Sequence, residues 1–391
     1  MVEAWKECLL GDVINLKRGY DLPNSLRSPG PFPIVSSSGI TDYHTEAKVM
    51  APGVVTGRYG TLGQVFFIEQ DFWPLNTSLY VQDFKGNDPR FISYFLGTLS
   101  LGSQNAAGAV PGVNRNHLHA MEVRVPPLPI QRRIAGILSA YDELIENSQR
   151  RIRILETMAR ALYREWFVHF RFPGHDHPAG QPDRTVAGRP AGASASDGAS
   201  PSVPRVPSPL GEIPEGWEVG RLDDVLVLQR GFDLPKAKRI EGEVPIYAAT
   251  GVTGFHNESK VKAPGVVTGR SGTIGEVIYV QENFWPLNTA LWAKEFPKAE
   301  PLYAYYVLSS LDLKQFNSGA AVPTLNRNDI HSLDTRIPPR QLQKKFQSEA
   351  SAMLKQARTL DLQTQALRRT RDLLLPRLLS GQIDVEAIAD A

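Results

Sequence analysis

The chain contains one domain twice, and this repeat constrains its fold more than any other feature. The ten residues FWPLNTSLYV, which begin at Phe72, return as FWPLNTALWA at Phe284, 212 positions later. The same offset relates APGVVTGR at 51–58 to its copy at 263–270. Units of a solenoid are about 20–50 residues long, so a repeat of this length predicts a duplicated domain rather than a solenoid.

The charge of the two repeats limits how either can bind nucleic acid. The whole chain of 391 residues has a net charge of only +2. Lys and Arg together number 10 against 11 Asp and Glu in residues 1–129, and 14 against 15 in residues 213–341. Neither repeat is basic overall, so a DNA-binding surface requires basic residues clustered on one face, or additional charge from a partner.

The cysteine content and the apolar segments bear on location. Cys8 is the single cysteine, which excludes an intrachain disulfide and suits a reducing compartment. The N-terminal residues MVEAWKECLLGDV include acidic side chains and lack the apolar core of a signal peptide. No apolar stretch reaches the roughly 18 residues that a membrane span needs. We therefore expect a cytoplasmic protein.

Each repeat has the pattern of a mixed α/β domain. Residues 52–70 contain two apolar, β-branched runs around a glycine-containing turn, which predicts a β-hairpin, and residues 77–84 predict a third strand. Residues 88–102 predict a helix with Asp88 as its N-cap and Pro89 at the first helical position. The second copy repeats this order of elements.

A heptad pattern follows each repeat. Apolar residues recur at alternating steps of three and four, which predicts two helices of about 35–40 residues, or roughly 50–60 Å. A long helix with one apolar stripe needs a partner, so we expect the two helices to pack antiparallel. The second stripe is weaker at Thr364 and Arg371. The predicted seam residues are Ile134, Leu138, Tyr141, Ile145, Ile152, Leu155 and Leu162 in the first helix and Phe346, Met353, Leu360, Leu367 and Leu374 in the second.

The segment between the first helix and the second repeat has a different composition. It is rich in Pro, Gly, Ala and Ser and cannot form a core, so we predict a flexible linker. The predicted fold class is α/β, or α+β, with two duplicated domains separated by two long antiparallel coiled-coil helices in a pseudo-two-fold arrangement. The predicted segments are 1–129 (first domain), 130–172 (first helix), 173–211 (linker), 212–341 (second domain) and 342–385 (second helix).

Motifs of catalysis are missing from the sequence. There is no G-x-x-x-x-G-K-[ST] phosphate loop, and GRYGTLG at 57–63 and GRSGTIG at 269–275 have the wrong glycine spacing for a dinucleotide-binding fingerprint. The [DNS]-P-P-[YF] tetrapeptide that an amino-methyltransferase needs is also absent. We interpret His169, His175 and His177 as solvated loop histidines rather than metal ligands. We therefore predict no catalytic residue, no bound metal and no cofactor in this chain.

The glycine-rich turns of the predicted hairpins carry arginines that suit DNA. Arg58 and Arg270 stand beside glycines, where a guanidinium can approach a phosphate or a guanine edge closely. The alternative is a surface ion pair on a tight turn. Both copies keep the arginine while its neighbour changes, as expected for two related readers of different sequences. The DNA-binding candidates are Lys17, Arg18, Arg58, Tyr59, Thr61 and Arg115 in the first repeat and Arg230, Arg270, Ser271, Thr273 and Arg327 in the second.

Two further repeated motifs have mainly structural interpretations. In the WPLN loops we expect the tryptophan to pack and the asparagine to bind the loop backbone, with base stacking by the tryptophan as the alternative. Asn114 and Asn326 begin Asn-Arg-Asn triplets that predict helix caps, with phosphate contact by the central arginine as the alternative. The residues assigned to the structural loops are Trp73, Asn76, Trp285 and Asn288.

Several longer phrases resemble one protein family. VPPLPIQRRI at 125–134 enters the first predicted helix, with a weaker counterpart at 337–346, and REWFVHFRFPGH at 164–175 closes that helix. SPLGEIPEGWEVGRLDDV at 208–225 opens the second repeat, and LLLPRLLSGQIDV at 373–385 ends the second helix. In combination, over essentially the whole chain, these phrases are similar to the specificity subunit of type I restriction–modification systems.

The resemblance implies a non-catalytic DNA reader. The two repeats would be target-recognition domains that each bind one half of a bipartite site in double-stranded DNA, and the helix pair would fix the unread gap. Two modification subunits, which bind S-adenosylmethionine and methylate adenine, would dock on the helices. Two restriction subunits, which act as translocase and nuclease, would join them. S-adenosylmethionine, ATP and Mg are therefore expected on partner subunits, and no membrane is involved.

Two departures from the family qualify this expectation. The linker is longer than the short connection usual in the family. The two domains are also unusually alike, which predicts chemically related half-sites and a nearly palindromic target. We expect the base-reading residues where the copies differ, at 24–32 against 236–244 and at 102–108 against 314–320, besides Tyr59 against Ser271.

Two other classes of function remain open from the sequence. One is a self-contained DNA-modifying enzyme with a degenerate site, which the missing base-pocket tetrapeptide disfavours. The other is a duplicated protein-interaction scaffold without DNA binding, which would show no salt-dependent binding to duplex DNA. A methylation assay on the isolated chain separates the first from the specificity subunit, and a binding assay with partners separates the second.

Overall fold

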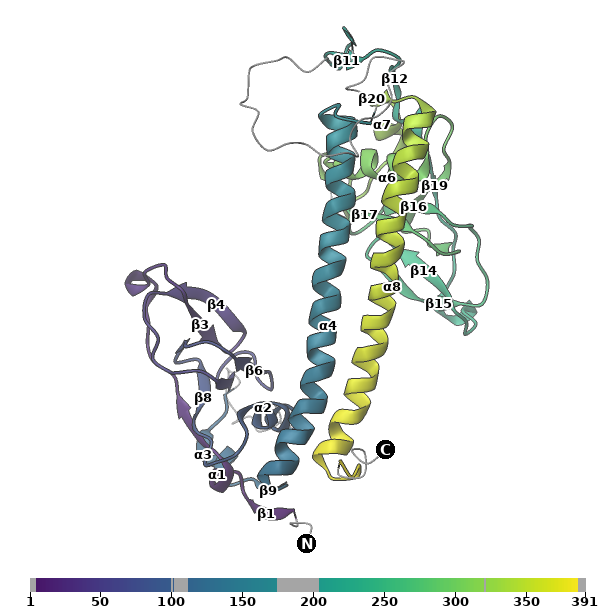
Figure 1. The fold of residues 1–391 in the computed structure, drawn as a ribbon. Coiled ribbons are helices and arrows are strands. Elements are labelled where there is room, and N and C mark those ends of the chain that lie inside the picture. The colour runs from purple at the N-terminus through teal and green to yellow at the C-terminus, as the bar shows by residue number, and fades with distance from the viewer. Residues whose placement is uncertain (1–4, 100, 102–111, 174–203, 320, 386–391) are drawn as a thin grey trace, which may run out of the picture. The chain divides into compact units, whose positions relative to one another are not determined.

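The division of the structure follows the duplication in the sequence. The computed structural model describes residues 5–99, 101, 112–173, 204–319 and 321–385. The chain splits into two compact units, residues 1–149 with 362–391 and residues 150–361. Each unit holds one repeat and one end of each of two long helices (Figure 1).

The first unit is built on two small sheets. The predicted hairpin at 52–70 and the predicted strand at 77–84 are both confirmed. The larger sheet is antiparallel, with the order β2 (Asn15–Arg18), β8 (Ser78–Asp83), β5 (Gly53–Gly57), β6 (Val65–Ile68). The smaller has the order β4 (Gly39–His44), β3 (Phe32–Ser36), β7 (Trp73–Pro74), with β3 and β7 parallel. The remaining short elements are β1 (Lys6–Leu9), β9 (Glu122–Val125), α1 (Leu10–Val13), the 3-10 turn η1 (Asn24–Leu26) and α3 (Arg115–His119).

The repeated phrase APGVVTGR forms the most buried strand of each large sheet. All five residues of β5 are buried, which suits its β-branched residues. A Cβ atom on Gly53 would lie 2.1 Å from the Phe72 ring, and one on Gly265 would lie 2.4 Å from the Phe284 ring. The glycine is therefore needed in both copies because an aromatic ring packs directly against the strand backbone.

The helix predicted at 88–102 is confirmed as α2 (Pro89–Thr98), although it is shorter than expected. Its start is set as the sequence indicated, because Asp88 Oδ1 accepts a hydrogen bond from the Phe91 N–H at 2.8 Å and Pro89 occupies the first turn. Phe91, Ile92, Phe95 and Leu96 form its buried face against the large sheet. This face anchors the first domain's core.

The second unit repeats the plan. Its large sheet has the order β13 (Val227–Arg230), β19 (Ala290–Glu295), β16 (Gly265–Gly269), β17 (Val277–Val280), and its small sheet has the order β15 (Gly251–His256), β14 (Val244–Ala248), β18 (Trp285–Pro286). Helix α6 (Pro301–Ser310) corresponds to α2. The other elements are β10 (Arg205–Val206), β11 (Ile213–Pro214), β12 (Glu218–Arg221), β20 (Asp334–Ile337), α5 (Leu222–Val225), α7 (Arg327–His331) and the 3-10 turns η4 (Lys236–Lys238) and η5 (Leu313–Phe316).

The two predicted long helices are confirmed as α4 (Leu128–Tyr163), which continues into a π-helical turn η3 (Arg164–Val168), and α8 (Arg340–Leu379). In the first unit, Ile134 and Leu138 near the start of α4 share a core with Leu378 near the end of α8, and Asp142 pairs with Arg371. In the second unit, Tyr163 at the end of α4 packs against Phe346 near the start of α8. Within each unit the helix segments therefore run antiparallel (Figure 1).

The predicted seam positions are covered in their own units. Ile134, Leu138 and Leu374 pack in the core of the first unit, and Leu162, Phe346 and Met353 pack in the core of the second. Ile134, Leu138, Ile145, Phe346 and Leu360 are buried, and Tyr141, Ile152, Leu155, Leu162, Met353, Leu367 and Leu374 are half-buried. The weak position at Arg371 has a physical reason, because its guanidinium donates to the Asp142 carboxylate at 2.5 Å instead of packing as an apolar residue.

The predicted linker, 173–211, ends in a segment that pairs with the second repeat. Residues 174–203, with His175 and His177, lie outside the described residues, but 204–211 are ordered against the second repeat. Strand β10 pairs with β11, and Arg336 Nη2 donates to the carbonyl oxygen of Leu210 at 2.6 Å. Composition gave no sign of this pairing because the partners, Ile213–Pro214 and Arg336, lie beyond the low-complexity segment. His169 is exposed just after η3.

Among the described residues, no helix is both long and apolar enough to span a membrane.

Candidate nucleic-acid interface

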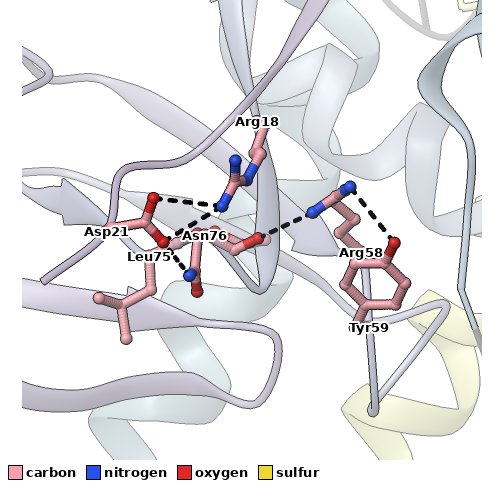
Figure 2. A network of polar contacts seen from close by, with 7 residues as sticks. Arg18, Asp21, Arg58, Tyr59, Leu75 and Asn76 are labelled. Atoms are coloured by element: carbon pink, nitrogen blue, oxygen red, sulfur yellow. Dashed lines mark hydrogen bonds and ion pairs between the residues drawn. The ribbon is translucent and has the colours of Figure 1, made fainter. Parts of the chain in front are cut away.

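The end of β2 places two basic residues beside an acidic one. Arg18 is exposed, and its Nη2 donates to both carboxylate oxygens of Asp21 at 3.1 and 3.2 Å. The Asn76 side-chain amide donates to the same carboxylate (Figure 2). Lys17 lies on the preceding position, with its ammonium 5.7 Å from the centre of the Tyr20 ring. The Asp21 carboxylate therefore holds both the Arg18 guanidinium and the side chain of Asn76 in the WPLN loop.

The hairpin tip after β5 joins this cluster through Arg58. Its Nη1 donates to the Asn76 carbonyl oxygen at 3.4 Å, and its Nη2 donates to the Tyr59 hydroxyl at 3.3 Å. The guanidinium also lies 4.4 Å from the centre of the Tyr59 ring. Figure 2 shows that Arg18, Asp21, Asn76, Arg58 and Tyr59 form one continuous set of polar contacts, which we call the Arg58 network.

The second repeat contains the same set, which we call the Arg270 network. Arg230 pairs with Asp233 at 3.7 Å, the Asn288 amide donates to Asp233, and Arg270 Nη1 donates to the Asn288 carbonyl oxygen at 3.3 Å. The residue that follows Arg270 is Ser271, which offers neither an aromatic ring nor a phenolic hydroxyl to the guanidinium. The two networks thus share a scaffold and differ at the tip.

The loop before α3 brings a further arginine to the hairpin tip. The Val113 N–H donates to the Arg58 carbonyl oxygen at 2.9 Å, directly before the Asn114 cap and Arg115. In the second repeat the Leu325 N–H donates to the Arg270 carbonyl oxygen at 2.8 Å, directly before Asn326 and Arg327. Thr61 and Thr273 are exposed in the same tips.

The predicted helix caps are confirmed in both copies. Asn114 Oδ1 accepts from the Asn116 N–H at 3.0 Å, and Asn326 Oδ1 accepts from the Asn328 N–H at 3.1 Å. These contacts satisfy backbone donors that the first turn of a helix leaves free. The arginine between the two asparagines is exposed in each copy and is not needed for the cap.

In the second repeat the basic residues line a cleft of about 530 Å³. Its walls are Gln229, Arg230, Gly231, Phe232, Asp233 and Arg327. The one acid in this lining, Asp233, is already paired with Arg230 and Asn288. A cleft with two guanidinium groups and a neutralised carboxylate can hold a phosphate oxygen, because arginine presents several donors in a fixed fork.

The tryptophans of the WPLN loops lie in the interior. Trp73 and Trp285 are each 7% exposed. The Lys48 ammonium lies 4.7 Å from the centre of the Trp73 ring, and the Lys260 ammonium lies 4.9 Å from the Trp285 ring. This environment suits packing rather than stacking on a base, so the tryptophans set the shape of the loop that carries Asn76 and Asn288.

The structure also shows a residue pair that the sequence analysis missed. The Leu16 N–H on β2 donates to His119 Nε2 at 2.9 Å, and the Leu228 N–H on β13 donates to His331 Nε2 at 2.9 Å. Burial, with added repulsion from Arg115 and Lys85, lowers the pKa of His119. Burial also lowers the pKa of His331. The sequence signal was that the two histidines occupy equivalent positions of the repeat, 212 residues apart.

The segments expected to read bases are only partly described. Residues 24–32 and 236–244 connect β2 to β3 and β13 to β14, each with a 3-10 turn. The second copy carries Lys236, Lys238 and Arg239 where the first carries Asn24, Leu26 and Arg27, so the second loop is more basic. Residues 102–108 and 320 lie outside the described residues, whereas 314–319 border the loop before α7.

Comparison with known proteins gives consistent results. The model of a family described as "Type I restriction modification DNA specificity domain" matches residues 2–157 and 214–360. The chain is 26% identical to the type I restriction enzyme MjaIX specificity subunit of Methanocaldococcus jannaschii, over 76% of this chain and 67% of that protein. It is 23% identical to the HindI specificity subunit of Haemophilus influenzae, over 72% of this chain and 73% of that protein. A crystal structure of a type I restriction–modification S subunit from M. genitalium has the same fold, with a TM-score of 0.69, 17% identity and 96% of each chain covered.

Proposed function

Because the chain belongs to the type I restriction modification DNA specificity family, we propose that each of its two recognition domains reads one half of a bipartite target in duplex DNA. Its role is that of the non-catalytic specificity subunit. The two half-sites are chemically related, since the two domains repeat long segments such as APGVVTGR almost unchanged, and the helices α4 and α8 set the unread gap between them.

The observation that carries this proposal is the agreement between the Arg58 and Arg270 networks. In both, an aspartate fixes an asparagine whose carbonyl oxygen accepts from an arginine at a hairpin tip. The backbone of that tip also bonds the loop before a short helix that begins with a second arginine. Among the described residues, the acceptor for the Arg270 guanidinium is the Asn288 carbonyl oxygen. An arginine held in this way keeps further N–H donors for a phosphate or for the O6 and N7 atoms of guanine.

The partners follow from the same assignment. Two modification subunits dock on α4 and α8 and supply S-adenosylmethionine chemistry, and two restriction subunits supply ATP- and Mg-dependent cleavage. The helices carry exposed apolar side chains that a docked subunit would cover. They are Leu144, Ile154 and Met158 on α4 and Leu362 and Leu373 on α8, each about half exposed or more. The expected location is the cytoplasm, where the DNA lies.

The near-neutral charge of the two domains is consistent with DNA binding that is shared with the partner subunits. Each domain clusters a few arginines but has no overall positive charge. Phosphate contacts dominate the affinity of DNA-binding proteins, so the modification subunits are expected to add contacts around the duplex. Binding by the full complex should therefore be stronger and more salt-dependent than binding by this chain alone.

Selection from a random duplex library tests the proposal. The full chain is assembled with its modification subunits, and the DNA it retains is sequenced. The expected result is two short, related half-sites separated by a constant gap, with adenine methylation that requires the complex. A single uninterrupted motif, or methyl transfer by the isolated chain, contradicts the proposal. The absence of any salt-dependent duplex binding favours the protein-interaction scaffold instead.

A further inference from the structure

The basic strand of each domain contains an irregularity at the same residue. The register of β2 against β8 shifts between Asn15 and Leu16, and that of β13 against β19 shifts between Val227 and Leu228. The extra residue of each irregularity lies on the partner strand, Gln82 in β8 and Lys294 in β19. Strands β2 and β13 are edge strands, so every second backbone N–H along them has no strand partner. Leu16 and Leu228 are fully buried, so a free N–H at this point would be costly.

In both domains a histidine from the short helix satisfies that N–H. His119 Nε2 accepts from Leu16, and His331 Nε2 accepts from Leu228, at the same distance of 2.9 Å. Nε2 can accept only when the imidazole is neutral and carries its proton on Nδ1. Protonation converts this acceptor into a donor that points at another donor, so the contact is lost.

The contact joins the two elements that carry the basic side chains. Strand β2 ends with Lys17 and Arg18, and α3 begins with Arg115. In the second domain, Arg327 Nη1 donates to the Leu228 carbonyl oxygen at 3.3 Å. The main chain of Leu228 is therefore held on its N–H side by His331 and on its carbonyl side by Arg327, both from α7.

The charges around each imidazole come from three sides. His119 faces two basic residues, Arg115 on its own helix and Lys85. The Lys85 ammonium donates to the Gly11 carbonyl oxygen of α1, and α1 also carries Asp12. A Cβ on Gly11 would lie 3.1 Å from His119 Cβ, so α1 packs closely on the histidine.

His331 has the corresponding surroundings with one acid added. It faces Arg327 on its own helix, and Asp223 and Arg221 at the turn into α5. Burial and the arginines favour the neutral ring, and Asp223 opposes them, but the pKa of His331 is still lowered.

We propose that His119 and His331 are positioning residues that keep the basic strand and the basic helix of each DNA-contacting face in one register, so that removing or protonating the imidazole weakens DNA binding at that half-site. This inference rests on the proposed function. The two histidines need not touch the DNA. They act through Lys17, Arg18 and Arg115 in the first domain and through Arg230 and Arg327 in the second.

The direction of the pH effect follows from the lowered pKa values. The unfolded or released imidazole has an ordinary value of 6.5, and the folded values lie below it. The contribution of each histidine is therefore complete above about pH 6.5 and is lost as the pH falls below that value towards the folded pKa.

Two double variants separate the effect of losing the hydrogen-bond acceptor from the effect of losing the imidazole ring. In His119→Gln/His331→Gln, an amide oxygen can take the place of Nε2 and does not titrate. In His119→Leu/His331→Leu, a side chain of similar size offers no acceptor. Gln131→Leu is a matched control for the loss of buried hydrogen bonds, because Gln131 bonds Asp88, Asn87 and Pro126 and none of the proposed DNA-contacting residues.

The full complex is tested with a labelled 40-base-pair duplex enriched from a random library by the wild-type complex. The wild-type dissociation constant is expected to rise several-fold more than that of the Gln double variant as the pH falls from 8 to 5.5. The Leu double variant is expected to bind about tenfold more weakly at pH 8, as the loss of one buried hydrogen bond in each domain allows. Gln131→Leu is expected to unfold at a lower temperature but to bind with wild-type affinity while folded.

Single variants add a second readout, the selected DNA motif, which general destabilisation of the protein does not change. His119→Leu should make one half of the enriched motif degenerate, and His331→Leu the other half. If the Leu variants lose only thermal stability, as Gln131→Leu does, the positioning role is overturned. It is equally overturned if wild-type affinity rises relative to the Gln variant on acidification, since that result would mean that the protonated ring attracts phosphate. Failure of the wild-type complex to bind any duplex at pH 8 would instead remove the proposed function itself.

Discussion

At one set of equivalent positions, the two units join their domain to the long helices through different chemistry. In the first, the Tyr94 hydroxyl of α2 donates to Asp142 Oδ2 on α4 at 2.5 Å, and Arg371 Nη1 on α8 donates to Asp142 Oδ1 at 2.5 Å. In the second, the residues 212 positions away along the repeat are Tyr306, Leu354 and Ala159. Tyr306 there stacks on Tyr163, with ring centres 5.0 Å apart, in a core that also contains Phe346.

This difference shows that one backbone plan accepts either a polar or an apolar junction at equivalent positions. An apolar junction is stabilised by the area it buries, without a partner for each group. A polar junction depends on every member, because a buried charge that loses its partner is costly, while replacing the whole set with apolar residues is often tolerated. The second junction should therefore contribute more stability, and the first should show stronger coupling between its residues.

The largest expected effect is at the apolar junction. Phe346 is fully buried and contacts the rings of Tyr163, Trp166, Phe167 and Tyr306. We expect Phe346→Ala to lower the free energy of unfolding by about 3–5 kcal/mol, because it removes a large side chain and leaves a cavity. Denaturant unfolding measures this change, and a loss below about 1 kcal/mol would mean that this core is not the main support of the second unit.

A smaller effect is expected at the polar junction. Arg371→Ala removes the cationic partner of Asp142, whose side chain is 34% exposed, while that of Arg371 is 28% exposed. Because water partly screens the pair, we expect a loss of about 2 kcal/mol, between the values typical of exposed and buried pairs. Arg171→Ala is a suitable control, since its ion pair with Glu165 lies on the surface and should contribute nothing measurable.

Converting the polar junction to the residues of the other unit tests the coupling directly. The variant Asp142→Leu/Arg371→Ala gives the first unit the side chains found at Leu354 and Ala159. We expect it to cost less than the sum of the two single changes by about 1 kcal/mol or more, since neither charge is then left alone. Strictly additive single and double variants would show that the two residues do not act as a pair.

The smallest effect concerns one hydroxyl in each unit. Tyr94→Phe removes the donor to Asp142, so we expect a loss of about 1 kcal/mol, as for a typical hydrogen bond. Tyr306→Phe is the matched change in the second unit, where the ring rather than the hydroxyl makes the described contacts, and we expect a change close to zero. Equal losses from the two variants would contradict the distinction between the junctions.

Much of the fold could be predicted because its signals are local or repeated. Asp88 and Pro89 are adjacent and define a helix start, and the hairpin around Gly60 lies within one short segment. The unusual character of Arg371 was visible in the heptad pattern, but its explanation was not. Its partner Asp142 is 229 residues away, and only the antiparallel packing brings the two together.

The candidate site was harder to predict for the same reason. The arginines of the hairpin tips were found from their glycine-rich setting. Asp21 fixes Asn76, and the carbonyl oxygen of Asn76 accepts from Arg58. Asp21 is 55 residues from Asn76, and no sequence pattern links the two. His119 was missed because its role depends on the position of β2 at the edge of the sheet, which is a property of strand pairing and not of local sequence. The ordered end of the linker, at 204–211, was missed because its partners lie in the following domain.

The division of reading between the two domains has one direct test, in which Arg58→Gln and Arg270→Gln are compared in the assembled complex. Each variant is put through duplex selection beside the wild type, with Arg171→Gln as a control outside both networks. The account predicts that Arg58→Gln degrades one half of the motif, Arg270→Gln degrades the other, and the control changes neither. Loss of the same half by both variants, or an unchanged motif in both, would contradict it.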